Sequence, residues 1–115
     1  MLPTALLLGM LLAGLTQWVA PGRADEAVTD PYLGQADAIS EGNDIYHAKC
    51  IICHGLGGGR GPNLFATQLT DDQFLETVTN GRKGTLMPSF GFQLSPDEVW
   101  KVHAFIKAHP GGLHL

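Results

Sequence analysis

With 115 residues, the chain has room for one small domain, and a hydrophobic content of 44% excludes a disordered or fibrous protein. Eleven acidic residues against seven basic ones give a formal net charge of −4 at pH 7, which argues against nucleic acid as a partner. The only two cysteines, Cys50 and Cys53, are three positions apart, so they cannot form the disulfide framework of a small secreted protein.

The first 24 residues have the pattern of a secretory signal peptide. The segment from Leu6 to Leu15 is almost entirely apolar and leads to small residues ending at Ala24, where we expect cleavage, with Ala20 as the alternative position. Cleavage after Ala24 would leave a mature charge of 6 − 11 = −5. The competing interpretation is a retained membrane anchor, but the apolar run is shorter than the roughly 20 residues of a spanning helix. We therefore expect export to the periplasm, with membrane attachment only if this segment is retained.

Residues 25–36 are expected to form an extended acidic arm, because they contain three acids, Pro31 and Gly34 without any periodicity. A first helix is predicted over residues 37–49, with Asp37 or Ser40 as its N-cap, and it would run directly into Cys50. The residues at helical spacing are Ile39, Gly42, Ile45, Tyr46 and Lys49.

Residues 55–68 are predicted to form a loop, because they are too rich in glycine for a helix or a regular strand. Two helix starts follow. Thr70 and Gln73 form a capping box, and Ser95 with Pro96 gives a second capped start. The first of these helices should end at Asn80-Gly81 and the second before Pro110.

No segment alternates as a strand, so the sequence predicts an all-α domain of three to five short helices over residues 37–109, followed by a tail at 110–115. Long glycine-rich loops contribute little apolar surface, and a domain of this size is already marginal. A bulky apolar group is therefore needed to complete the core, and a haem macrocycle would serve.

The motif Cys50-Ile51-Ile52-Cys53-His54 is the c-type haem attachment pattern. Two thiols at this spacing can add to the two vinyl groups of one haem, and the histidine that follows supplies a nitrogen ligand to the iron. We considered three alternatives. A thioredoxin-like pair would need alternating strands and helices, a structural zinc site would need a fourth ligand, and a disulfide closing so small a loop would stabilise little.

Met87 is the predicted sixth ligand, because the other two methionines lie in the expected signal peptide. The alternative role for Met87 is core packing, which methionine performs more often. His47, His103 and His109 are rival ligands. His47 is too near the attachment motif to reach the opposite haem face, and His103 and His109 are expected to be solvated or only partly packed.

The order of these motifs, from about Asp37 to Lys107, resembles a class I cytochrome c. The resemblance rests on the attachment motif, Gly61-Pro62-Asn63-Leu64, Asn80-Gly81 and Met87-Pro88-Ser89-Phe90. It implies one covalently bound haem c, a close helix crossing at Gly42 near Tyr46 and Phe105 or Trp100, and a Pro62 carbonyl that orients the His54 ring.

A histidine and methionine pair would fill both axial positions of the iron, so we expect an electron carrier rather than an enzyme, with no small-molecule substrate. Its partners would be a dehydrogenase as donor and an oxidase or another cytochrome as acceptor. Asp30-Pro31-Tyr32 and the segment from Gly59 to Leu64 are also similar to cytochromes that accept electrons from quinoprotein methanol dehydrogenases.

Four basic residues are predicted to surround the haem, namely Lys49, Arg60, Arg82 and Lys83. They would give an acidic molecule a locally positive haem face, which would attract a negatively charged partner. The alternative is an unorganised scatter of charge over a solvated surface.

Overall fold

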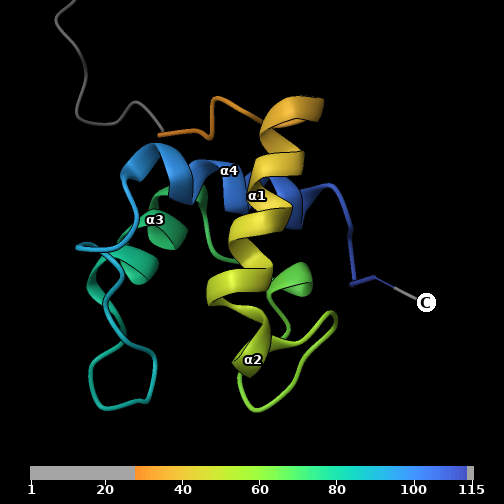
Figure 1. Cartoon of the computed structure of the whole chain (residues 1–115). Helices are drawn as coiled ribbons and strands as arrows, with labels where there is room; N and C mark the ends of the chain where they lie inside the picture. Colours follow the sequence, from red (N-terminus) through yellow and green to blue (C-terminus); the bar gives the residue numbers. More distant parts are fainter. Residues whose placement is uncertain (1–27, 114–115) are drawn as a thin grey trace, which may run out of the picture.

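The computed structural model describes residues 28–113, and in that range it contains only helices and loops. The elements in chain order are α1 (Ala36–Lys49), α2 (Ile51–His54), the 3-10 helix η1 (Leu64–Ala66), α3 (Asp71–Asn80) and α4 (Pro96–Lys107) (Figure 1). The predicted all-α fold is confirmed. The expected signal peptide lies outside the described residues.

The main helix contact is a crossing of α1 over α4, visible in Figure 1. Gly42 lies at the crossing point, and a Cβ atom there would stand only 1.9 Å from the carbonyl oxygen of Lys101. The Tyr46 and Phe105 rings pack beside the crossing with centroids 5.5 Å apart. Phe105 rather than Trp100 is therefore the aromatic partner of Tyr46, and the backbones approach closely because residue 42 has no side chain.

Capping side chains determine where α3 and α4 begin. Thr70 Oγ1 accepts a hydrogen bond from Gln73 N at 3.2 Å, and Gln73 Oε1 accepts one from Thr70 N at 3.0 Å. Ser95 and Glu98 make the same reciprocal pair at 3.1 and 2.9 Å. Both capping boxes satisfy amide groups that a helix start leaves free. The box at Thr70 and the Ser95 cap confirm the sequence predictions, and the return bond from Glu98 adds a second box.

Two local predictions are wrong. Helix α1 begins at Ala36 with Gln35 as N-cap and no side-chain cap, so neither Asp37 nor Ser40 caps it. The glycine-rich segment 55–68 is not wholly loop, because η1 forms within it. Asn63 caps this turn by accepting a hydrogen bond from Phe65 N at 3.0 Å, and the Phe65 side chain is buried.

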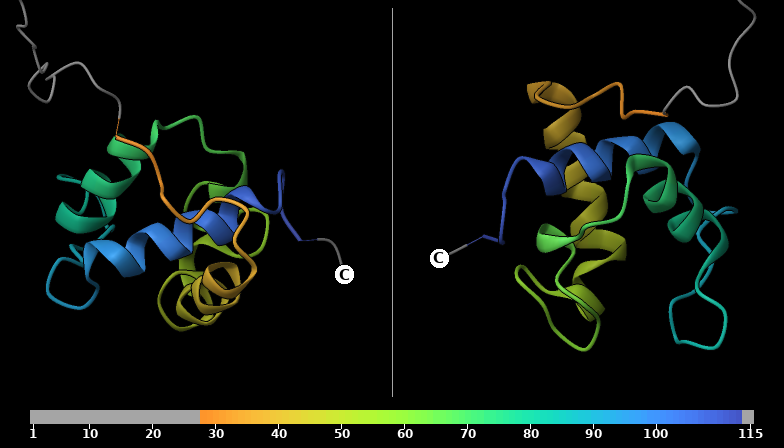
Figure 2. Two further views of the ribbon diagram at one scale, coloured as in Figure 1. Left: turned by 90° about the horizontal axis from the view of Figure 1, so that it is seen from above. Right: turned by 180° about the vertical axis from the view of Figure 1, so that it is seen from behind.

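The segment before α1 packs against the domain. Figure 2 shows it running along α4, and its residues 31–34 form a turn. Asp30 is buried, with its carboxylate 2.8 Å from His103 Nδ1, and the Tyr32 hydroxyl donates to Asp97. The part of the arm that is described is thus compact and anchored, because its polar side chains find partners on α4.

The core joins α1, α3, α4 and the loops between them. Its buried members are Tyr46, Phe65, Phe74, Val78, Phe90, Leu94, Val99, Val102, Phe105 and Ile106. Between residues 28 and 113, no helix combines the length and the hydropathy that crossing a bilayer requires.

Candidate functional site

A large cavity opens between α2 with its following loop on one side and α3 with its following loop on the other. The ribbons of these two parts of the chain lie apart in Figure 1 and in the right-hand view of Figure 2. The cavity has a volume of about 1000 Å³, and Phe74, Val78, Leu94 and Val102 line its inner part. Protein interiors hold few voids larger than a water molecule. An apolar space of this size therefore indicates a binding site for a large apolar group.

The attachment motif lies on one wall of this cavity. Cys50 follows the last residue of α1, and the short α2 turns Cys53 and His54 toward the cavity, where all three residues line the wall. Both thiols are free, with Cys50 half-buried and Cys53 exposed. Burial raises the pKa of the Cys50 thiol to about 11. Cys53 is therefore the more accessible of the two sulfur atoms.

A hydrogen bond from its Nδ1 atom fixes the orientation of the His54 ring. His54 Nδ1 donates a hydrogen bond to the Pro62 carbonyl oxygen at 2.8 Å, and the side chain is only 8% exposed. Because Nδ1 carries the proton, Nε2 keeps its lone pair and is the nitrogen able to bind a metal. Gly61 makes room for the ring, since a Cβ at this position would lie 2.8 Å from His54 Cε1.

Met87 lines the cavity in the loop that follows α3 and is half-buried. Its N–H donates to Thr85 Oγ1 and its carbonyl accepts from Arg82 N, both at 3.2 Å. These bonds close a tight loop, and the Met87 side chain lines the cavity and packs against the edge of the hydrophobic core. Sequence-predicted residues from two separate parts of the chain, His54 and Met87, thus line one cavity.

The rim of the cavity is apolar and basic. Ile52 is 78% exposed and Leu86 is 97% exposed, and both line the opening. The charged residues that line the cavity are Lys49, Arg60 and Arg82, and none of the acidic residues in the described part of the chain does so. Lys83 is exposed in the same loop as Arg82 but does not line the cavity.

The rival histidines lie elsewhere, since none of them lines the cavity. His47 Nδ1 bonds its own helix at Asn43 O, 2.9 Å away, and His109 packs on the Phe105 ring. His103 is completely buried, so the expectation that it is solvated or partly packed is wrong. The sequence carried a signal for this burial, because His103 lies four residues after Val99 and three before Ile106, within the buried stripe of α4.

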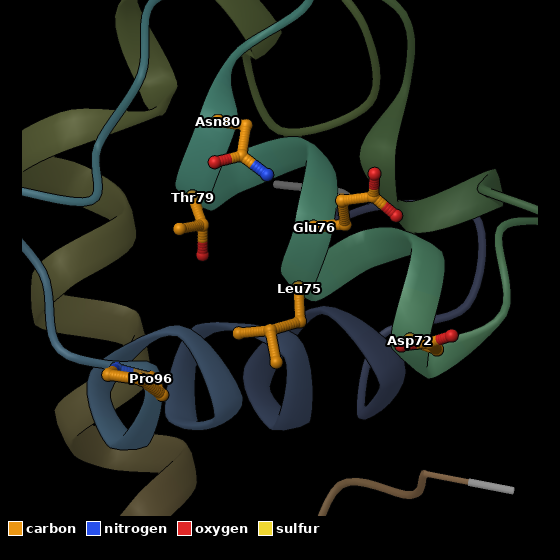
Figure 3. A pocket seen from close by; sticks show the side chains of 6 residues that line it. All are labelled: Asp72, Leu75, Glu76, Thr79, Asn80 and Pro96. Carbon is orange, nitrogen blue, oxygen red and sulfur yellow. The ribbon is translucent and has the colours of Figure 1, made fainter. Parts of the chain in front are cut away.

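A second hollow of about 380 Å³ lies between α3 and the start of α4 (Figure 3). It is lined by Asp72, Leu75, Glu76, Thr79, Asn80 and Pro96, and shares no residue with the larger cavity. None of the predicted site residues lies there. In the described part of the chain, no three His, Cys, Asp or Glu side chains come together as a metal site.

The residues around the larger cavity fit an iron porphyrin. An imidazole nitrogen and a thioether sulfur suit iron as axial donors. The apolar inner part suits the macrocycle, and two free thiols stand beside the imidazole for covalent attachment.

Comparisons with known proteins agree with this geometry. Residues 37–106 match the family described as "Cytochrome C oxidase, cbb3-type, subunit III". Cytochrome c6 of Gloeothece citriformis is 31% identical, with 96% of each chain covered. The quinohemoprotein alcohol dehydrogenase ADH IIB of Pseudomonas putida is 32% identical over 87% of this chain, which matches 16% of that protein.

Among solved structures, cytochrome cL from Hyphomicrobium denitrificans superposes with a TM-score of 0.63 and 32% identity, covering 69% of this chain and 51% of that one. The first curated relatives are much longer proteins, since the chain spans between 16% and 37% of their lengths.

Proposed function

Because the chain belongs to the c-type cytochromes and carries covalently bound haem c, we propose that Cys50 and Cys53 hold the haem and that His54 and Met87 ligate its iron. The domain is an electron carrier of the class I cytochrome c fold and not an enzyme. The observation that carries the residue assignment is the cavity of about 1000 Å³ that both His54 and Met87 line.

The protein residues prepare the site for electron transfer in three ways. Pro62 fixes the His54 ring and leaves Nε2 free, so this nitrogen would bind the iron without a change of ring orientation. Phe74, Leu94 and Val102 give the inner part of the cavity an apolar lining, which would exclude water from the bound haem. Bound haem iron supplies a reversible one-electron change, and a thioether ligand from Met87 raises its reduction potential.

The partners we propose are redox proteins, with a dehydrogenase as donor and an oxidase or another cytochrome as acceptor. A quinoprotein alcohol or methanol dehydrogenase is the proposed donor, supported by the similarity to ADH IIB and to cytochrome cL. The location we propose is the periplasm, after export and removal of residues 1–24. The docking surface is the rim formed by Ile52 and Leu86 with the basic residues Lys49, Arg60, Arg82 and Lys83.

The attachment is tested by expressing the full chain with a haem-attachment system and staining denaturing gels for haem peroxidase activity. The wild type should stain, Cys50→Ser should stain weakly, and the double variant Cys50→Ser with Cys53→Ser should not stain. An unstained wild type of the correct mass would refute the proposal. Reduction of the ferric protein by a quinoprotein alcohol dehydrogenase, followed by stopped-flow absorbance, tests the donor separately.

A further inference from the structure

The loop that carries Met87 returns onto the end of α3 and caps it. Helix α3 ends at Asn80, so no backbone N–H of the helix donates to the carbonyl oxygens of Val78 and Thr79. Phe90 N donates to Val78 O at 2.9 Å, and Gly91 N donates to Thr79 O at 3.0 Å. The chain immediately after Met87-Pro88 is therefore tied to the last turn of a packed helix.

Ser89 adds a side-chain hydrogen bond between the Met87 loop and the end of α3. Its Oγ donates to Thr79 O at 2.6 Å, a distance at the short end of the hydroxyl range. Ser89 lies two residues after Met87 and is exposed, so its hydroxyl is not needed for core packing. The loop before Met87 offers no equivalent bond to a helix, because the Thr85 hydroxyl bonds only within the loop, donating to Arg82 O at 2.7 Å and accepting from Met87 N at 3.2 Å.

We infer that Ser89 is a positioning residue for the sixth iron ligand. Its bond to Thr79 fixes the Met87 loop to α3, and α3 is packed into the core through Phe74 and Val78. Loss of the hydroxyl leaves the fold intact and frees Met87 to leave the iron more often. The inference rests on the proposed function, in which Met87 supplies the thioether.

Competition by an external ligand measures this effect. Imidazole binds ferric iron only when the Met87 bond is open, so its apparent affinity reports the population of the open loop. In the holo-protein Ser89→Ala, imidazole should bind about threefold to tenfold more tightly than in the wild type, the range that one lost hydrogen bond produces. Ser89→Thr keeps a hydroxyl and should bind imidazole like the wild type.

Ser40→Ala is the matched control, because it removes an exposed hydroxyl from α1, away from the Met87 loop. Its imidazole affinity should equal that of the wild type. Equal affinities for Ser89→Ala and Ser40→Ala would overturn the positioning role. The amide protons of Phe90 and Gly91 give a second readout, since they should exchange with solvent faster in Ser89→Ala and at the wild-type rate in Ser40→Ala.

Met87→Leu separates a failure of the inference from a failure of the proposed function. This variant keeps the apolar volume and removes the thioether, so imidazole should bind it without competition. If Met87→Leu bound imidazole no better than the wild type, Met87 would not be the ligand, and the assignment on which the inference rests would fall. If Met87→Leu bound more tightly and Ser89→Ala did not, only the positioning role would fall.

Discussion

His103 on α4 and Asp30 before α1 form a fully buried pair, with His103 Nδ1 2.8 Å from Asp30 Oδ2 and both side chains at 0% exposure. The second carboxylate oxygen of Asp30 accepts from Tyr32 N at 2.8 Å, and the Asp30 amide donates to Asp71 on α3 at 2.8 Å. The pair therefore joins the N-terminal segment to two helices. Polar groups buried this deeply stabilise a fold only while they remain paired.

We expect Asp30→Ala to lower the free energy of unfolding by about 2–4 kcal/mol, because it leaves the His103 N–H buried without an acceptor. Asp30→Asn should cost less, since its single amide oxygen can replace one of the two carboxylate acceptors. Guanidinium denaturation of the holo-protein measures both. The control Asp44→Ala removes an exposed carboxylate of α1 and should stay within about 0.5 kcal/mol of the wild type. A loss for Asp30→Ala no larger than for Asp44→Ala would contradict the role of the pair.

Gly61→Ala should disturb the His54 ring. The new Cβ would lie 2.8 Å from Cε1 and 2.9 Å from Nδ1 of His54, so the ring must move and lose its bond to Pro62. We expect reduced haem incorporation and a changed reduction potential in the fraction that matures. The control is Gly57→Ala in the same loop, where the nearest atom would be 3.7 Å from the Cβ. Haem absorbance per unit protein and potentiometric titration compare the two, and equal values would argue against a steric role for Gly61.

The parts of the fold that local chemistry controls were predictable from the sequence. Thr70-Gln73 and Ser95-Glu98 place the starts of α3 and α4 because each capping box is complete within four residues. Gly42 at the helix crossing followed from the family resemblance, and the structure shows the contact that requires it. The resemblance to class I cytochromes c is confirmed by the family match and by the shared fold.

The parts that were missed depend on contacts between distant residues. The pairing of His103 with Asp30 was not predictable, because Asp30 lies 73 residues away and has no periodic pattern around it. Only the burial of His103 was indicated locally, by its position in the apolar stripe of α4. The start of α1 is an exception with a local cause. Gln35 caps the helix without a side-chain hydrogen bond, whereas Asp37 and Ser40, whose side chains are suited to capping, lie inside the helix. Long-range pairing of polar groups leaves little trace in a local sequence window.

Alkaline pH should destabilise the protein through Tyr46. Burial raises the pKa of this phenol to about 12, whereas an unfolded tyrosine ionises near its ordinary value of 10. Between these values the unfolded chain has lost the proton and the folded one retains it, so the free energy of unfolding falls as pH rises above about 10. We expect a contribution of about 2 kcal/mol by pH 12. Denaturation of Tyr46→Phe at pH 9 to 12 should show a shallower decline, and an unchanged decline would exclude Tyr46 as its source.

Charge reversal at the rim tests whether the basic residues attract the partner. Arg82→Glu with Lys83→Glu changes the net charge by four units beside the cavity, and we expect the association rate with a quinoprotein methanol dehydrogenase to fall about tenfold or more at low ionic strength. Added salt should reduce the difference from the wild type, because exposed charges are screened.

The matched control places the same substitution away from the rim. The control variant is Lys107→Glu. Lys107 is exposed at the end of α4 and does not line the cavity. Per unit of charge, this variant should slow association much less than the rim variant, since steering depends on where the charge lies as well as on the total. Stopped-flow traces at several salt concentrations separate the two effects. Equal slowing per unit charge would mean that net charge alone governs the encounter, and the basic residues around the cavity would then have no steering role of their own.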